Sequence, residues 1–219
     1  MEGCKFMLLC VVTMGIVTIV NACSCLPQHP QQHICGANFA IKALVQSKVT
    51  VGMQWVYTVQ VQVTFKGSLG IGSATIYTAF QSAACGVYLQ IGETYLLTGS
   101  FSGGQYHISL CGWNPLWSSL TFEQTIFIYN SCNPIYNCLC QVCSSWNSPC
   151  SLKSCEWDPS RSVQYGGNAY VNCEASYGAC VSKRGRCSWI SPPGTSNLRL
   201  CRNVREKKVE ALFRRKKSD

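Results

Sequence analysis

Apolar and polar residues alternate most regularly between Trp55 and Gly67. Within WVYTVQVQVTFKG the odd-numbered positions are apolar through Phe65, and the even-numbered positions are polar apart from Val56. Successive side chains of a strand point to opposite faces, so this period of two predicts a strand with one buried face. Similar stretches, separated by glycines, follow at residues 74–80, 94–101 and 105–110. Several short strands joined by glycine turns favour a small closed barrel.

Two other segments have less decisive patterns. FAIKALV, residues 39–45, is apolar at almost every position, which suits either a strand or a helix. Residues 118–130 predict a short helix with Ser118 or Ser119 as its N-cap.

The pattern changes after about residue 132. Closely spaced cysteines, with Ser, Asn and Pro between them, replace the alternation. This composition predicts a second unit held by disulfides, because it is too small to rely on a large apolar core. From Arg202 the chain has few apolar residues, and we expect a mobile tail that forms a helix only transiently.

The first 22 residues have the composition of a secretory signal peptide. An apolar run over residues 6–20 follows a short head, and Ala22 precedes Cys23. The run is shorter than the roughly 20 residues that span a bilayer, and we predict no membrane span elsewhere. We therefore expect cleavage after Ala22 and secretion to the extracellular space or extracellular matrix, with Cys23 as the first mature residue.

Cysteine usage agrees with secretion. The chain has 17 cysteines, and Cys4 and Cys10 would leave with the signal peptide. The remaining 15 predict a disulfide framework. Because their number is odd, at least one is free or paired with another chain.

Positive charge is concentrated near the C-terminal end. Residues 183–219 contain 12 Lys and Arg against 3 Asp and Glu, a net charge of +9 that equals the excess of the whole chain. Clustered positive charge favours a polyanionic partner. For a secreted protein we expect sulfated glycosaminoglycan rather than nucleic acid; the alternative is a solvated tail without a partner. The candidate residues are Arg202, Arg205, Lys207, Lys208, Arg214, Arg215, Lys216 and Lys217.

Enzyme chemistry finds little support in the sequence. No serine-nucleophile, zinc-protease or phosphate-binding motif is present, and the acidic residues have no catalytic spacing. A structural zinc site at Cys138, Cys140 and Cys143 is disfavoured, because secreted cysteines usually pair. We predict that the protein is not an enzyme and has no cofactor of its own, and we interpret His29 and His33 as loop residues.

The first mature residues carry a specific motif. CSCLPQHPQQHIC, residues 23–35, has cysteines at its first, third and thirteenth positions, and it resembles the mature N-terminus of the tissue inhibitors of metalloproteinases. The resemblance covers roughly Cys23 to Trp189. It is carried further by VQVTFKG (61–67), IYTAFQSAACGVYLQIGETYLLTG (76–99), HISLC (107–111), PLWSSL (115–120), CEW (155–157) and CSW (187–189).

The resemblance implies a fold and a disulfide pattern. The fold would be mainly β: an N-terminal OB-fold (netrin-like) five-stranded barrel plus a small disulfide-rich C-terminal domain. The implied pairs are Cys23–Cys85, Cys25–Cys111, Cys35–Cys138, Cys140–Cys187, Cys143–Cys150 and Cys155–Cys180. Cys132 remains an alternative to Cys138, and Cys132, Cys173 and Cys201 are extra cysteines of which two could form an added bridge. The expected division is a signal peptide (1–22), an inhibitory OB-fold domain (23–138), a cysteine-rich domain (139–201) and a basic tail (202–219).

The resemblance also implies an inhibitor of matrix or membrane-anchored zinc metalloproteases. The amine and carbonyl of Cys23 would chelate the catalytic zinc of the protease, so the metal would be shared with the target. The substrate cleft would be filled by Ser24, Cys25, Leu26 and Pro27, with Ser82, Ala83 and Ala84 beside Ser24. The alternative function is a netrin-like extracellular module that binds glycosaminoglycan or matrix and does not inhibit proteases.

Overall fold

The computed structural model describes residues 23–130, 138–144, 150–151, 153–167 and 170–215. The predicted signal peptide and Cys132 lie outside these ranges. Across the described part of the chain, no helix is both long enough and apolar enough to cross a membrane.

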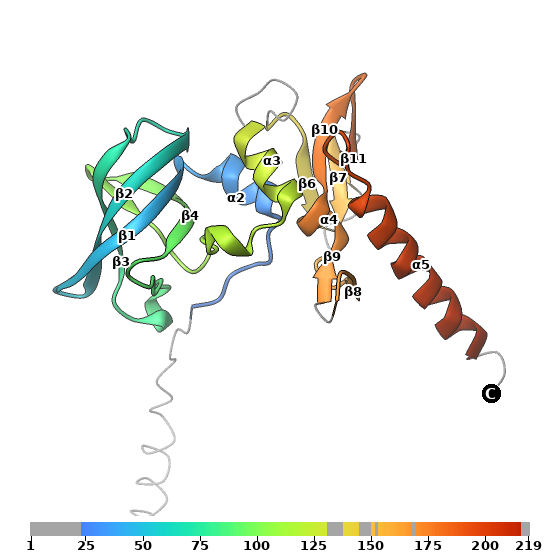
Figure 1. Cartoon of the computed structure of the whole chain (residues 1–219), viewed down its shortest axis with the longest axis horizontal. Coiled ribbons are helices and arrows are strands. Elements are labelled where there is room, and N and C mark those ends of the chain that lie inside the picture. The colour runs from blue at the N-terminus through green and yellow to red at the C-terminus, as the bar shows by residue number, and fades with distance from the viewer. Residues whose placement is uncertain (1–22, 131–137, 145–149, 152, 168–169, 216–219) are drawn as a thin grey trace, which may run out of the picture.

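Five strands of the N-terminal unit close into a barrel, seen at the left of Figure 1. They are β1 (Phe39–Val51), β2 (Gln54–Lys66), β3 (Gly72–Ala79), β4 (Thr94–Ser102) and β5 (Gln105–His107). Their order is β1-β2-β3-β5-β4, and β1 also pairs with β4 to close the ring. The predicted fold class, a mainly β chain with a five-stranded barrel and a disulfide-rich second unit, is confirmed.

The barrel core follows the alternation of β2. Tyr57, Val59 and Val61 have no exposed surface and fill the interior. A register shift opposite Lys42 and Ala43 lies between Val61 and Phe65, and Phe65 packs with Ala40 into a second apolar cluster outside the barrel. β2 therefore extends past the barrel interior and contributes to both cores.

β1 resolves the ambiguity of residues 39–45 in favour of a strand. Ile41 packs into the barrel core, whereas its neighbour Ala40 packs into the second cluster. Because both faces of the strand are buried, its sequence is apolar throughout and shows no period of two.

The strand predicted at residues 105–110 is shorter in the structure. β5 ends at His107, because the chain then turns back and the Leu110 N–H donates to the Cys85 carbonyl at 2.9 Å. A disulfide-bonded corner ends this strand, and the alternation does not reveal that.

The helix predicted near residue 120 is present but begins later. A single 3-10 turn, η2 (Trp117–Ser119), precedes α3 (Phe122–Asn130). Thr121 caps α3: its Oγ1 accepts from the Gln124 N–H at 3.1 Å, and Gln124 Oε1 accepts from the Thr121 N–H at 2.9 Å. The prediction of a serine cap is therefore wrong, because this reciprocal Thr–Gln box satisfies two backbone groups at once.

In the described residues of the C-terminal unit, the strands form three two-stranded sheets. A parallel pair is formed by β6 (Gln141–Ser144) and β7 (Ser154–Trp157). The antiparallel pairs are β8 (Ser162–Gln164) with β9 (Tyr170–Asn172), and β10 (Ala179–Lys183) with β11 (Arg186–Ile190). The short helix α4 (Cys173–Tyr177) lies between these two pairs in sequence. The described residues of the C-terminal unit form two apolar clusters, and both include disulfide-bonded cysteines. This is expected for a unit with a small core.

The expected mobile tail is a helix in the structure. α5 (Asn197–Arg215) has 19 residues and projects away from the C-terminal unit (Figure 1). The division expected at residues 201 and 202 falls inside this helix, next to the buried Cys201. The Cys173–Cys201 disulfide and ion pairs to Glu174 hold the first half of the helix. The prediction of a mobile tail, made from composition alone, is therefore wrong.

Candidate functional site

The N-terminal segment from Cys23 to Gln28 runs extended along the outside of the molecule. Ser24, Cys25, Leu26 and Pro27 are all exposed, and the Leu26 side chain retains 82% of its accessible surface. The apolar Leu26 side chain is therefore accessible to a partner, although a single exposed apolar residue does not by itself mark a contact surface.

Two disulfides fix this segment to the barrel. The structure pairs Cys23 with Cys85 and Cys25 with Cys111, the pairs that the resemblance implies. The bridges lie side by side, since the sulfurs of Cys23 and Cys111 are 3.9 Å apart. Both bridges close large loops, of 62 and 86 residues in sequence separation. The first three residues therefore cannot move independently of the barrel.

A second exposed segment lies next to the first bridge. The 3-10 turn η1 (Ser82–Ala84) directly precedes Cys85, and its three residues are exposed. Cys85 has a left-handed backbone with φ of 62°, which is unusual for a residue with a side chain. The turn is joined to the N-terminal segment through the Cys23–Cys85 disulfide, and the two exposed segments are called here the N-terminal edge (23–27 and 82–84).

Side chains from the barrel hold the chain that follows this edge. The buried Tyr57 hydroxyl donates to the Val87 carbonyl at 3.2 Å and accepts from the Leu89 N–H at 2.9 Å. Thr78 Oγ1 accepts from the Val87 N–H at 3.0 Å. These bonds take the place of strand pairing for residues 86–89 and fix the position of the edge.

The sequence predicts His29 and His33 as loop residues, but in the structure both belong to the helix α2 or its cap. His29 is the N-cap of α2 (Pro30–Gly36), and its Nδ1 accepts from the Gln31 N–H at 3.1 Å. The side chain is 1% exposed, and burial lowers its pKa to about 4, with a smaller opposing effect of Glu174. His33 lies within α2, and burial lowers its pKa too. The sequence contains a signal for α2, a proline at its first position, but histidine is not a usual cap.

The other disulfides staple the two units and the C-terminal helix. Cys35 pairs with Cys138, while Cys132, the alternative partner, lies outside the described residues. The C-terminal unit contains the other implied pairs, Cys140–Cys187, Cys143–Cys150 and Cys155–Cys180. Cys173 and Cys201, whose pairing the sequence left open, join α4 to α5.

No separate metal site is apparent among the described residues. The close groups of potential metal ligands there consist of cysteines already joined in disulfides, including the four sulfurs behind the N-terminal edge. Disulfide sulfurs are not thiolates and are poor ligands for zinc.

The predicted polyanion-binding residues divide into two groups. Arg202 and Arg205 form ion pairs with the buried Glu174, each at 2.8 Å, so the structure uses them internally. The side chains of Lys207, Lys208 and Arg214 are exposed on the projecting half of α5. The side chain of Arg215 lies outside the described part of the structure, and so do Lys216 and Lys217.

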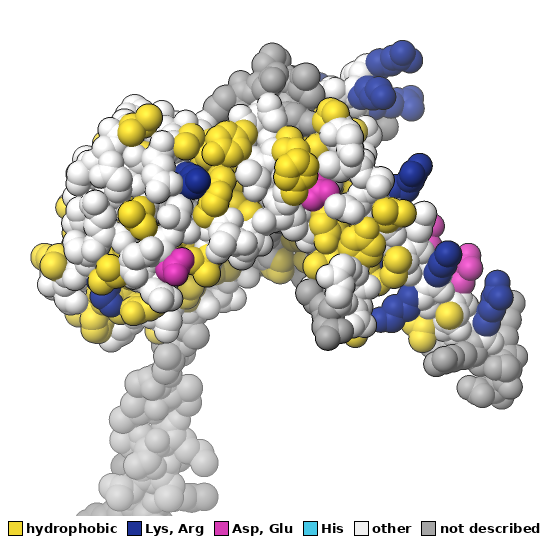
Figure 2. All heavy atoms as spheres, viewed as in Figure 1, with side chains coloured by type: hydrophobic (Ala, Val, Ile, Leu, Met, Phe, Trp, Pro, Cys, Tyr) yellow, Lys and Arg dark blue, Asp and Glu magenta, His cyan; other side chains and the backbone are white. Residues whose placement is uncertain are grey.

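A second group of exposed cations lies at the tip of the β10–β11 hairpin, and the predicted polyanion-binding residues do not include it. Lys183, Arg184 and Arg186 are exposed at the tip of the β10–β11 hairpin. Figure 2 shows Lys and Arg side chains at this tip, at the upper right, and along α5 below it. The distribution of charge along the sequence locates the cationic region, and the fold separates it into the hairpin and the helix.

Comparison with known proteins identifies the family. A family model described as tissue inhibitor of metalloproteinase matches residues 21–189. Metalloproteinase inhibitor 3 of Scyliorhinus torazame is 27% identical, and the match covers 88% of this chain and 93% of that protein. Metalloproteinase inhibitor 4 of Rattus norvegicus is 33% identical over 63% of this chain and 67% of that protein. Metalloproteinase inhibitor 3 of Gallus gallus is 29% identical over 80% and 86%. The chain belongs to the tissue inhibitor of metalloproteinase family.

Proposed function

We propose that this protein is a secreted inhibitor of zinc metalloendopeptidases and acts through the N-terminal edge. The relatives are named metalloproteinase inhibitors. The observation that carries the proposal is an exposed segment, Cys23 to Pro27, fixed by two adjacent disulfides next to a second exposed turn.

The chemistry of the first mature residue suits a zinc ligand. The catalytic zinc of a protease keeps an open position that holds water. An α-amine has a pKa of about 7.7–8.0, so near neutral pH it loses its proton at modest cost. The amine and carbonyl of Cys23 would together occupy the zinc and displace the water. This step requires removal of residues 1–22, since an amide nitrogen at Cys23 would not bind the metal.

The residues after Cys23 would fill the substrate cleft. Ser24 would point toward the pocket beside the zinc, and Leu26 would continue along the cleft with its exposed apolar side chain. Ser82, Ala83 and Ala84 would contact the protease beside Ser24. A free peptide would lose conformational entropy on binding, whereas the two bridges order this edge beforehand.

The test compares two forms of the purified protein. One begins at Cys23 and the other carries one additional alanine before Cys23. We expect stoichiometric inhibition of a matrix metalloprotease catalytic domain by the first form and a loss of at least about 100-fold with the second, since the amine is no longer available. Equal inhibition by both forms would refute the chelation mechanism. Absence of inhibition by either form would favour a netrin-like binding module.

Binding of sulfated glycosaminoglycan is a second candidate function. It is favoured by the cationic side chains of the β10–β11 tip and of the projecting half of α5. Replacing Lys207 and Lys208 with Gln should lower the salt concentration that elutes the protein from heparin. Replacing Arg202 and Arg205 is not an equivalent test, because it would break the ion pairs with Glu174. An unchanged elution position for the Lys207/Lys208 variant would argue against a role for the helix.

A further inference from the structure

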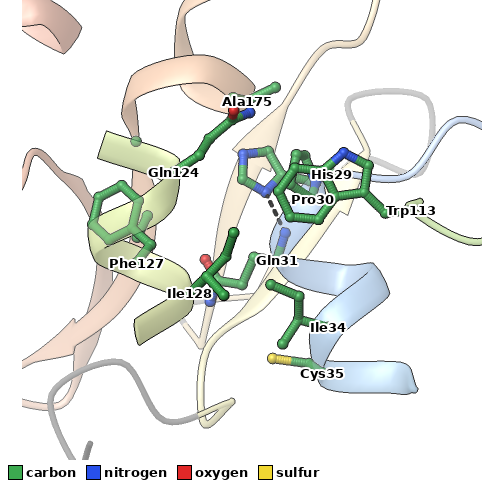
Figure 3. Close-up of a pocket in the computed structure, with 12 residues that line it drawn as sticks. His29, Pro30, Gln31, Ile34, Cys35, Trp113, Gln124, Phe127, Ile128 and Ala175 are labelled. Atoms are coloured by element: carbon green, nitrogen blue, oxygen red, sulfur yellow. Dashed lines mark hydrogen bonds between the residues drawn. The ribbon is translucent and has the colours of Figure 1, made fainter. Parts of the chain in front are cut away.

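His29 occupies the junction between the N-terminal segment and the C-terminal unit. Its ring lies 4.8 Å from the ring of Trp189 and 5.5 Å from that of Trp157, centroid to centroid. On its other side it lines a small cavity of about 40 Å³, together with residues of α2, α3 and α4. Figure 3 shows the imidazole next to Pro30 and Trp113, with Gln124 on its other side.

Two glutamines next to His29 bind α2 to the C-terminal unit. Gln31 makes two hydrogen bonds with the backbone of Cys180, its Nε2 donating to the carbonyl and its Oε1 accepting from the N–H, each at 2.8 Å. Gln32 Nε2 donates to the Val142 carbonyl at 2.9 Å, while its Oε1 accepts from the His29 N–H. The first turn of α2 is therefore attached to both β6 and β10.

The hydrogen bonds of His29 define its protonation state. Because Nδ1 accepts the Gln31 N–H, the proton of the neutral ring is on Nε2. That Nε2 is buried and makes only a poorly aligned contact with the Glu174 backbone. A second proton would have to go to Nδ1, where it would remove the cap and place a charge at the N-terminus of a helix.

The surroundings offer little compensation for a charged ring. The group of opposite charge that acts on His29 is Glu174 of α4, but Arg202 and Arg205 of α5 already pair with this carboxylate. His33 on α2 adds a small unfavourable effect. Trp157 of β7 and Trp189 of β11 are uncharged. Gln124 of α3 uses both polar atoms of its side chain in other bonds.

We propose that His29 is a positioning residue: its neutral imidazole locks α2 onto the C-terminal unit, and acidification releases this lock. His29 is six residues after Cys23, so the lock sets the direction from which the N-terminal segment reaches its edge. The effect on inhibition rests on the proposed function, whereas the release of α2 does not.

The size of the effect follows from proton linkage. If the His29 pKa is about 4 in the locked state and the ordinary value of about 6.5 in the released state, the ratio of released to locked protein rises about 10-fold from pH 7.5 to 5.5. The neutral ring thus favours the locked state fully above pH 6.5, and this preference decreases as the pH falls toward 4.

The experiment measures hydrogen-exchange protection of the α2 amides, with the full mature chain, at pH 7.5 and 5.5. We expect protection to fall by up to about 10-fold in the wild type. The fall should be clearly smaller in His29→Phe, which keeps a ring but leaves only the half-buried His33 to be protonated on this helix. His29→Asn keeps a cap and serves as a second variant if the phenylalanine variant fails to fold. His33→Gln, on the same helix, is the matched control. It removes the smaller contribution of His33 and should keep most of the wild-type fall in protection.

Inhibition supplies an independent readout. Protonation of the Cys23 amine should weaken inhibition equally in all variants at low pH, so the contribution of His29 is the additional loss in wild type relative to His29→Phe. Constant protection of α2 in the wild type, or an equal fall in His29→Phe, would overturn the proposal. Either result leaves the inhibitory function intact, and failure of inhibition would not affect the exchange measurement.

Discussion

Tyr57→Phe removes one buried oxygen atom that organises the chain behind the N-terminal edge. The hydroxyl makes two hydrogen bonds, to the Val87 carbonyl and from the Leu89 N–H, and all three residues are buried. The variant leaves both backbone groups without this partner in an apolar core. Each unsatisfied group costs about 1–3 kcal/mol. We expect the free energy of unfolding to fall by about 2–4 kcal/mol.

The assay is equilibrium unfolding in urea with the disulfides intact. With a slope of about 2–3 kcal/mol/M, the midpoint should fall by roughly 1 M. Tyr88→Phe is the matched control, because its side chain is 65% exposed, and its stability should change by less than about 0.5 kcal/mol. A Tyr57→Phe variant as stable as the Tyr88→Phe variant would refute the assignment of these hydrogen bonds as anchors of the edge.

Three further changes test other parts of the account. Burial alone would raise the pKa of Glu174, but its arginine partners outweigh burial and lower this pKa. Glu174→Gln should therefore lower the free energy of unfolding at pH 7 by about 2 kcal/mol. The difference from wild type should shrink as the pH falls below the ordinary glutamate pKa of 4.5 and disappear below the lowered pKa of the folded protein, which acid titration of unfolding would detect. A Cβ on Gly86 would overlap a backbone oxygen of β3, so Gly86→Ala should lower the free energy of unfolding in urea by several kcal/mol. Gly70 has open space around it, and Gly70→Ala should leave the stability unchanged. Replacing both Cys173 and Cys201 with serine should lower stability by about 3 kcal/mol and increase proteolysis of α5, and unchanged cleavage would contradict the role of this bridge.

Local patterns predicted the barrel well, because its strands have one buried face. Trp55 to Phe65 alternate as a strand should, and β2 covers this stretch. Residues 39–45 could not be assigned, since burial of both faces removes the alternation that distinguishes a strand from a helix. The N-terminal edge was predicted from the resemblance to a family, and the cysteine spacing alone would not have indicated a second segment at residues 82–84.

Tertiary contacts explain the failures. The sequence around Arg202 is polar and charged, as in a mobile tail, but Glu174, about 30 residues earlier, pairs with it and stabilises the helix. His29 lies in a stretch rich in proline and glutamine, which is typical of a loop. Its burial depends on Trp157 and Trp189, far away in sequence. Such long-range partners leave no mark on the local pattern.

The N-terminal edge brings these observations together. The disulfides of Cys23 and Cys25 fix it to the barrel, Tyr57 anchors the chain behind Cys85, and α2 attaches its other end to the C-terminal unit. In the proposed complex, an edge held from three sides binds without further ordering, which increases affinity.

The most direct test of zinc chelation uses a metalloprotease catalytic domain in which cobalt replaces zinc. The mature protein should change the visible absorption of the cobalt at one equivalent, because the Cys23 amine and carbonyl replace the bound water. The same protein with its α-amine acetylated should leave the spectrum unchanged at equal concentration. An identical spectral change with the acetylated protein, or inhibition by the mature protein without any spectral change, would contradict the account.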